Sequence, residues 1–376
     1  MYNYNLKTDY VFGLLIGISI VLGMFYSFGL FLALFILMLR YKIDLNRTKI
    51  LIVTSGMLMA TFIVVIGYYE KNYNFVFLFF EILPYIVFMI FLLFTPSVDF
   101  LKGVYLAILI LFFVDAAFNF SLLLTGHDLV GRNLSHRADD IVFSRLGGVF
   151  GHPYLSITLS FLTGILAMCF RDKKIIIIAF IMIFINGSLK GTMALCGLLY
   201  LVFFFKNKNN FSLSIIQPVV LIFSVVTLTI LSLPFMSELS GNYFRVYSWS
   251  YAFTSYLNNL FLGGGPFNIN PIESISTFAL MDHGVAESRL LQTGLYFGSV
   301  PLFFQFLFLI LLIKFCYEKN NTTDSWYYTQ LSLASFLLFD VAVGTIFGSI
   351  ISSCIIPLIL TTKVETETET ETETAN

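Results

Sequence analysis

Long apolar runs alternate with short charged segments along most of the chain. The runs cover approximately residues 10–24, 27–40, 50–68, 75–95, 103–124, 153–170, 175–188, 191–205, 214–235, 291–313 and 328–360. A helix needs about 20 apolar residues to cross a hydrocarbon core of roughly 30 Å. The first two runs fit one long helix or two short ones, and the last fits two helices with a break near Gly344. The pattern predicts an all-α polytopic membrane protein with ten to twelve transmembrane helices.

Composition supports this class. Hydrophobic residues make up 58% of the 376 residues, charged residues only 11%, and the mean hydropathy is +0.88. A soluble domain carries about a quarter charged residues. Such a chain cannot cover its surface with polar groups, so we expect membrane lipid around it and no nucleic-acid partner.

The chain is predicted to form one transmembrane domain, residues 1–363, followed by a tail. Residues 364–376 read VETETETETETAN, a Glu-Thr repeat that holds five glutamates. Such a low-complexity, charged segment cannot bury a core and is predicted to be disordered. We interpret it as a tolerated extension, with a docking tail as the alternative.

Lysine and arginine placement predicts the orientation, because cytoplasmic loops carry an excess of these residues. If the loop after residue 40 is cytoplasmic, strict alternation places twelve basic residues inside: Arg40, Lys42, Arg47, Lys49, Lys102, Arg171, Lys173, Lys174, Lys206, Lys208, Lys314 and Lys319. Seven fall outside: Lys71, Arg132, Arg137, Arg145, Lys190, Arg245 and Arg289. The two longest loops, about 125–152 and 236–290, then face outward.

These two outer loops hold every histidine of the chain: His127, His136, His152 and His283. They also hold five arginines, against the usual bias. Anchoring to lipid headgroups is the simple explanation; binding of a phosphorylated substrate is the more specific one, because the planar guanidinium matches phosphate oxygens in pairs. No HExxH, P-loop, GxGxxG or GxSxG pattern accompanies them. The chemistry predicted here uses no metal and no cofactor, and needs a substrate that arrives already activated.

Three carboxylates lie inside apolar runs: Glu81, Asp115 and Asp340. An acid in a membrane span is a functional hypothesis by default. The alternative is an acid near the end of a span or one hydrogen-bonded between helices.

Four segments, taken in order, resemble the bacterial O-antigen polymerase and ligase superfamily. GGVFGHPYLSITLSFLTGILA (147–167) resembles its Gly-x-Phe-x-His-Pro-Asn segment, and INGSLKGTMALCGLLYLVF (185–203) its Ser-Arg-Gly turn, with Lys190 in place of arginine. YFRVYSWSYAFTSYLNNLFLGGGPFN (243–268) resembles its Arg-x3-Trp helix and Gly-x-Gly-Pro turn, and DHGVAESRLLQTGLYFGSVPLFF (282–304) its His-Asn segment before a late span. Tyr154 and Gly284 stand where asparagine is usual.

The resemblance implies a metal-independent glycosyl transfer from an undecaprenyl-pyrophosphate-linked oligosaccharide, at the periplasmic face of a bacterial inner membrane. It assigns His283 as the base that takes the proton of the acceptor hydroxyl and Arg245 as a pyrophosphate ligand. Lys190 and Arg145 are expected as further ligands, and Arg137, His152 and Arg289 as further substrate-binding residues. Arg137 precedes Gly148 by eleven residues, a spacing found in some polymerase loops. A separate chain-length regulator is a possible protein partner.

The same motifs leave the acceptor open. A polymerase adds the chain to the next lipid-linked repeat unit, and we favour it; a ligase adds the chain to lipid A core. A lipid-linked oligosaccharide flippase is the alternative from a different class, since it would use Glu81, Asp115 and Asp340 along a transport path.

Overall fold

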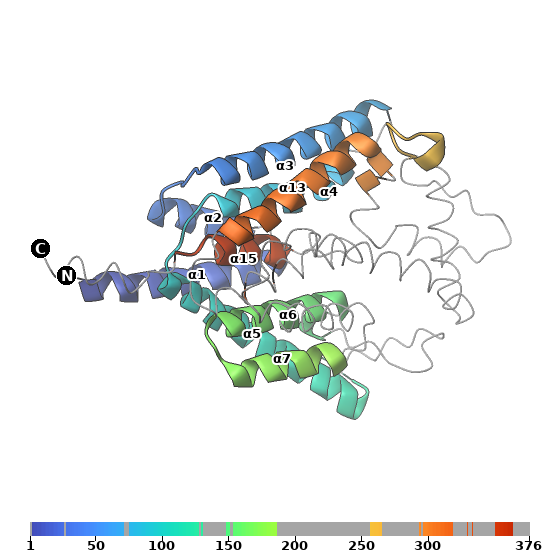
Figure 1. The fold of residues 1–376 in the computed structure, drawn as a ribbon. Coiled ribbons are helices and arrows are strands. Elements are labelled where there is room, and N and C mark those ends of the chain that lie inside the picture. The colour runs from blue at the N-terminus through green and yellow to red at the C-terminus, as the bar shows by residue number, and fades with distance from the viewer. Residues whose placement is uncertain are drawn as a thin grey trace, which may run out of the picture.

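The computed structural model describes residues 2–25, 28–70, 75–127, 129–130, 148–150, 153–185, 256–264, 293–294, 296–318, 329, 333 and 350–363. Most of these residues are helical (Figure 1), and their extended pairing is limited to isolated bridges such as Ile43 with Phe94. The all-α prediction is therefore confirmed for this part of the chain. Two described helices, Arg47–Glu70 and Val98–Thr125, are long and apolar enough to cross a membrane. The predicted total of ten to twelve spans stays a prediction, because several of the expected spans lie outside the described residues.

The first two apolar runs form two helices that pack against each other, not one long helix. The helices are α1 (Tyr2–Phe25), α2 (Phe28–Arg40), α3 (Arg47–Val65), α4 (Phe75–Leu92), α5 (Val98–Thr125), α6 (Pro153–Cys169), α7 (Lys173–Ile185), α13 (Ser299–Glu318) and α15 (Ile350–Thr361). A five-residue π-helix, η1 (Ile66–Glu70), extends α3, and a 3-10 turn, η2 (Gly148–Phe150), precedes α6. Figure 1 shows these helices as a bundle, with α3, α4 and α13 on one side and α5, α6 and α7 on the other.

Local sequence explains where the longest helices begin and end. The Asn46 side chain accepts a hydrogen bond from the Lys49 backbone N–H at 2.8 Å and caps α3, and Ser97 caps α5 by accepting from the Phe100 N–H. Such caps satisfy backbone donors that a helix leaves free at its N-terminus. Gly126 ends α5 in the left-handed conformation, with φ of 73°.

Glycines let α1 and α5 approach closely enough for their backbones to touch. A Cβ at Gly103 of α5 would stand 2.2 Å from the Tyr10 carbonyl oxygen of α1, and a Cβ at Gly13 would stand 1.9 Å from the Phe100 carbonyl oxygen. One turn further along, a Cβ at Gly17 would stand 2.6 Å from the Cβ of Ala107. Small residues four apart on facing helices are typical of close helix packing in membranes. This is the most extensive contact among the described helices.

The basic residues gather at one end of the bundle. This is the end at which α1, α3, α5 and α7 begin and α2, α4, α6, α13 and α15 finish, and the chain connections tie it together. All the lysines and arginines in the described ranges belong to it: Lys7, Arg40, Lys42, Arg47, Lys49, Lys102, Arg171, Lys173, Lys174, Lys314 and Lys363. The predicted grouping of the clusters at 40–49, 102, 171–174 and 314 is confirmed as one end of the bundle, and that this end faces the cytoplasm stays a prediction.

Two ionic contacts join the elements at this basic end. Arg40 pairs with Asp9 of α1 at 2.6 Å, and Ser97 donates to the other oxygen of Asp9 at 2.7 Å. Beside them lies Tyr41, whose pKa is raised by burial and further by the Asp9 carboxylate, so its hydroxyl stays neutral.

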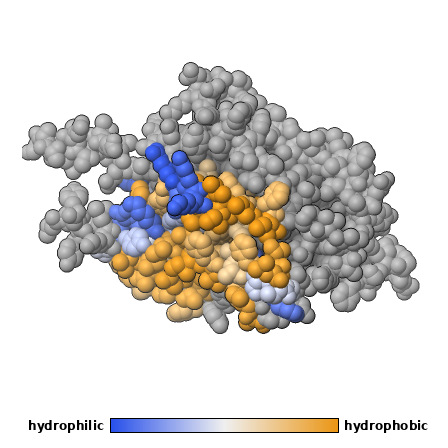
Figure 2. Space-filling model, turned by 90° about the horizontal axis from the view of Figure 1, so that it is seen from below, coloured by the Kyte–Doolittle hydropathy of each residue, from blue (hydrophilic) through white to orange (hydrophobic). Residues whose placement is uncertain are grey.

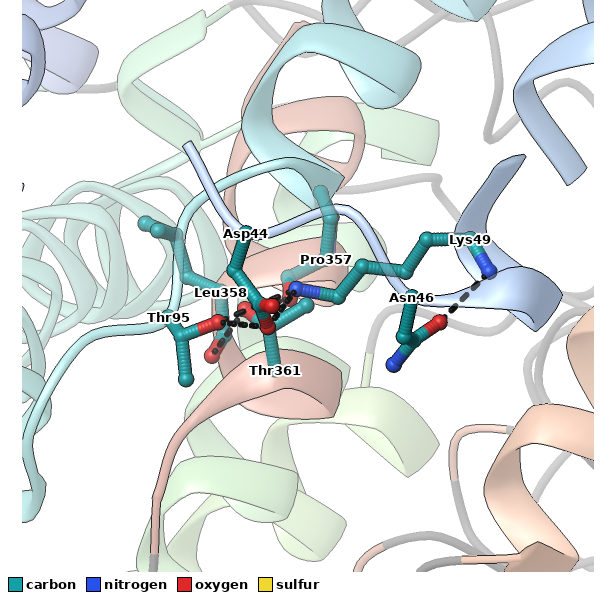
Figure 3. A network of polar contacts seen from close by, with 7 residues as sticks. All are labelled: Asp44, Asn46, Lys49, Thr95, Pro357, Leu358 and Thr361. Carbon is teal, nitrogen blue, oxygen red and sulfur yellow. Dashed lines mark hydrogen bonds and ion pairs between the residues drawn. The ribbon is translucent and has the colours of Figure 1, made fainter. Parts of the chain in front are cut away.

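The second contact surrounds a buried lysine (Figure 3). Lys49 has only 1% of its side chain exposed, yet its ammonium reaches Asp44 and the Thr95 hydroxyl, each at 3.0 Å. Thr95 in turn donates to Asp44 at 2.8 Å, and Thr361 of α15 lies alongside. The Lys363 backbone N–H donates to the Pro96 carbonyl at 2.9 Å. The network links the α2–α3 connection, the α4–α5 connection and the end of α15.

The outer faces of the helices are apolar. On α2, Phe28 is 73% exposed and Phe31 70%, and further exposed aromatic and aliphatic residues follow on α5, α7 and α13. Figure 2 shows one face on which apolar residues cover most of the described surface. Monomeric soluble proteins rarely expose contiguous apolar patches of large area. The described helices thus expose an apolar surface, and that lipid covers it stays a prediction.

Candidate functional site

A buried polar cluster lies between α5, η2 and α6, towards the end of the bundle opposite the basic residues. Its centre is Asp115, which is 0% exposed. The carboxylate accepts hydrogen bonds from the Val149 backbone N–H at 2.9 Å, from the Asn119 side-chain amide at 3.1 Å and, at a shorter distance, from the Ser156 hydroxyl. Asn119 also donates to Ser156 at 2.9 Å. Buried carboxylates require such partners, because removal from water without them is costly.

The helical register explains why these side chains meet. Asp115 and Asn119 are four residues apart on α5 and therefore lie on the same face. Ser156 is in the first turn of α6, and Val149 is in η2, so the two enter the cluster from either side of the connection between those elements. One carboxylate thus contacts two points of the chain seven residues apart.

Gly148 makes this close approach possible. Its φ is +57°, a conformation that residues with a side chain rarely adopt, and an added Cβ would stand 1.8 Å from the Asp115 Oδ1. The glycine at this position of the Gly-x-Phe segment is therefore required by both the turn and the carboxylate. The sequence presented it as part of a motif; the structure supplies the reason.

The Asn119 side chain leaves one acceptor open. Its Oδ1 is buried and makes no hydrogen bond, although its amide nitrogen serves both Asp115 and Ser156. Among the described residues, no lysine or arginine lies in the cluster. The Asp115 carboxylate acts there as a hydrogen-bond acceptor for three surrounding donors. The cluster can hold the backbone of η2 in place. The cations that bind the pyrophosphate and the general base of a glycosyl transfer would have to come from other residues.

A second junction lies at the same end of the bundle, where residues 256–264 dock onto the beginning of α13. The Tyr256 hydroxyl and the Ser299 hydroxyl are 2.6 Å apart, and Ser299 donates to the Leu260 carbonyl through its hydroxyl at 2.8 Å and its backbone N–H at 2.9 Å. A Cβ at Gly263 would stand 2.5 Å from the Tyr296 carbonyl carbon, and one at Gly298 would stand 2.0 Å from the Phe261 carbonyl oxygen. Both glycines have positive φ, +69° and +89°.

This junction joins the ends of two segments that resemble the polymerase and ligase superfamily. Gly263 belongs to the turn of the segment 243–268, and Gly298 belongs to the segment 282–304. Thirty-five positions separate the two glycines, so their contact is a property of the tertiary structure.

The residues that the sequence predicts for substrate binding and catalysis lie outside the described residues. They are Arg137, Arg145, His152, Lys190, Arg245, His283 and Arg289. Their mutual distances, and the roles assigned to them, stay predictions. Among the three acids in apolar runs, Asp340 also lies outside, and Glu81 is half-buried in the second turn of α4.

Asp115 has no role in the predicted glycosyl transfer, and the transport alternative includes it only together with Glu81 and Asp340. It was one of three acids in apolar runs, and nothing marked it above Glu81 and Asp340. The signal that could have singled it out is its spacing: an acid and an asparagine four residues apart, on one face of an otherwise apolar helix.

Comparison of the chain with models of known protein families and with curated proteins finds no match.

Proposed function

We propose that this chain is a polytopic inner-membrane glycosyltransferase that polymerises undecaprenyl-pyrophosphate-linked repeat units of a surface polysaccharide at the periplasmic face. Two features of the bundle support a membrane location: the apolar outer faces of the helices and the confinement of described lysines and arginines to one end. By the positive-inside rule, that end would be cytoplasmic. The Asp115 cluster and the Gly263–Gly298 junction would then lie towards the periplasm.

The observation that carries the proposal is the arrangement of the resembling segments. All four have described residues, the segment 185–203 only through Ile185 at the end of α7, and in each these include the end of the bundle remote from the basic residues. At that end, glycines of these segments leave no room for a side chain: a Cβ at Gly148 would meet the Asp115 carboxylate, and one at Gly263 would meet the backbone around Gly298. An enzyme that acts on lipid-linked donors outside the cytoplasm would need its loops there.

In the proposed reaction, an acceptor sugar hydroxyl attacks the anomeric carbon of the donor. The new C–O bond forms as the bond from the anomeric carbon to the pyrophosphate oxygen breaks, and undecaprenyl pyrophosphate leaves. His283 takes the hydroxyl proton, a role suited to a group whose ordinary pKa is near neutrality. Arg245 stabilises the charge that develops on the pyrophosphate, with Lys190 and Arg145 as further ligands. His152, Arg137 and Arg289 bind the remainder of the substrate.

The flippase alternative relied on acids along a transport path. In the structure the Asp115 carboxylate is fully buried and accepts three hydrogen bonds from protein groups. A carboxylate in that state is occupied in holding a turn, so it gives the transport alternative no support.

The experiment is the surface polysaccharide profile of a strain from which the gene is deleted. Loss of a polymerase leaves lipid A core capped by a single repeat unit, and expression of the wild-type chain restores the ladder of longer products. Core without any cap would indicate a ligase or a flippase and would overturn the proposal.

Arg245 provides the residue-level test in the same strain. Arg245→Ala should abolish extension, and Arg245→Lys should retain part of it, because lysine keeps the charge but loses the bidentate fork. His136→Ala is the matched control, since His136 is also a cationic candidate of the outer loops but no motif includes it. Full extension by Arg245→Ala at wild-type protein level would remove Arg245 from the site.

A further inference from the structure

We propose that Asp115 is a positioning residue that holds η2 and the first turn of α6 at a fixed separation, and so constrains the two-residue connection between them, to which His152 belongs in the sequence. The inference rests on the proposed function, in which His152 contributes to substrate binding. It concerns a residue for which neither the motifs nor the proposed reaction has a role.

One carboxylate on α5 bonds to both η2 and α6. Asp115 Oδ1 accepts from the backbone N–H of Val149, three residues before His152, and Oδ2 accepts from the hydroxyl of Ser156, four residues after it. The two partners enter from opposite sides of the same short stretch of chain. A single rigid group that contacts both flanks fixes the separation of the flanks and their height along α5.

The rest of the cluster keeps the carboxylate itself in place. Asn119, one turn further along α5, donates to Asp115 Oδ2 at 3.1 Å and to Ser156 at 2.9 Å, which closes a triangle of hydrogen bonds around that oxygen. Gly148 leaves room for Oδ1 at a distance that no side chain would allow. Asp115, Asn119, Ser156 and Gly148 are all buried, so water does not compete for these bonds.

A purely structural explanation would need only an apolar contact here. Ile, Leu or Phe at position 115 would pack α5 against α6 at no desolvation cost, and buried ionic groups are often no more stabilising than such residues. A carboxylate offers what they lack, which is directional bonding to a backbone N–H in a turn. The cluster is therefore better suited to fixing the path of the chain than to adding stability.

The test uses the full-length protein in nanodiscs and two measurements: hydrogen exchange of the Val149 amide, and donor KM and kcat for polymer extension. Asp115→Ala should expose the Val149 amide to rapid exchange while α5 and α6 stay protected. It should raise the KM for the lipid-linked donor, with kcat/KM about 100-fold lower, the loss typical of a misplacement of about 1 Å. Asp115→Asn should be intermediate, because its side-chain oxygen still accepts from Val149.

A matched pair of serines controls for general damage to α6. Ser156→Ala removes a donor to Asp115, whereas Ser160→Ala removes an equally buried hydroxyl, one turn along, that bonds only to the helix backbone at 3.0 Å. Ser156→Ala should raise the donor KM and Ser160→Ala should not. If Asp115→Ala fails to fold, this pair of serine variants still tests whether the Asp115 cluster affects donor binding.

Three results would overturn the proposal: unchanged protection of Val149 in Asp115→Ala, lost protection with unchanged extension, or equal effects of the two serine variants. The second of these would leave the proposed function intact, since the wild type would still extend polymer. If the wild type extends nothing, the proposed function fails, and exchange at Val149 still shows whether Asp115 holds η2.

Discussion

The contact between α1 and α5 permits a quantitative test of how the bundle is held together. A Cβ at Gly103 would stand 2.2 Å from the Tyr10 carbonyl oxygen and 2.6 Å from the Leu14 backbone nitrogen. Both obstacles are backbone atoms of α1, which no change of side-chain conformation can move. Since an ordinary contact is about 3.4 Å, Gly103→Ala requires α1 and α5 to separate by more than 1 Å. A gap of 0.5–1 Å already forfeits roughly a quarter to a half of each dispersion contact across it.

The expected change in the free energy of unfolding for Gly103→Ala is the difference of two effects. Overpacking of this kind costs about 1–3 kcal/mol, and here the upper part of that range applies because the helices must move as units. Replacing a helical glycine by alanine returns about 1 kcal/mol of helix propensity. We therefore expect Gly103→Ala to destabilise the protein by about 2 kcal/mol.

Gly164 of α6 is the matched control. It is also a glycine inside an apolar helix that packs on a neighbour, but a Cβ there would meet the Ala179 Cβ at 3.4 Å, an ordinary contact. Gly164→Ala should therefore be neutral or slightly stabilising. The assay is the thermal midpoint of the purified protein in detergent, followed as the loss of the monodisperse peak in size-exclusion chromatography. A Gly103→Ala midpoint equal to or above that of Gly164→Ala would refute the argument from backbone contact.

Three further predictions address the membrane orientation, the base and the buried lysine. In intact spheroplasts, a cysteine at position Ser135 should react with an impermeant thiol reagent added from outside, and one at Asn207 should not; the reverse pattern would invert the topology. His283→Ala should leave a membrane-inserted protein that binds donor but extends polymer roughly 10²–10⁴-fold more slowly, as expected for a lost general base; normal polymer would place the base elsewhere. Asp44→Ala should lower the thermal midpoint more than Lys49→Met does, because the first variant leaves a buried ammonium without its carboxylate and the second removes the charge; the opposite order would refute the argument that the unpaired buried charge sets the cost.

The sequence alone determined most of the described helix boundaries and the gathering of lysines and arginines at one end of the bundle. Runs such as 50–68, 103–124 and 153–170 became α3 with η1, α5 and α6 with shifts of a few residues. Local signals bound two of these runs: Asn46 caps the start of α3, and Ser97 and Gly126 cap the two ends of α5. The grouping of the basic clusters at one end also follows from the sequence, since alternate connections between antiparallel helices must share a side. The number of helices in the first 40 residues did not follow, because the break after Phe25 lies within an unbroken apolar stretch.

Only the tertiary structure decided which glycines and acidic residues make contacts between helices. Gly103 and Gly164 are alike in sequence, and the difference between them is the distance to a backbone on another helix. Asp115, Glu81 and Asp340 are alike as acids in apolar runs, and Asp115 was distinguished by a backbone N–H 34 residues away. In the sequence, Gly263 and Gly298 look like ordinary turn glycines. In the tertiary structure, a Cβ at either one would collide with the backbone of the other's segment. Periodicity reports how a residue faces along its own helix, whereas contacts between segments depend on how the helices are packed, and that information is not local.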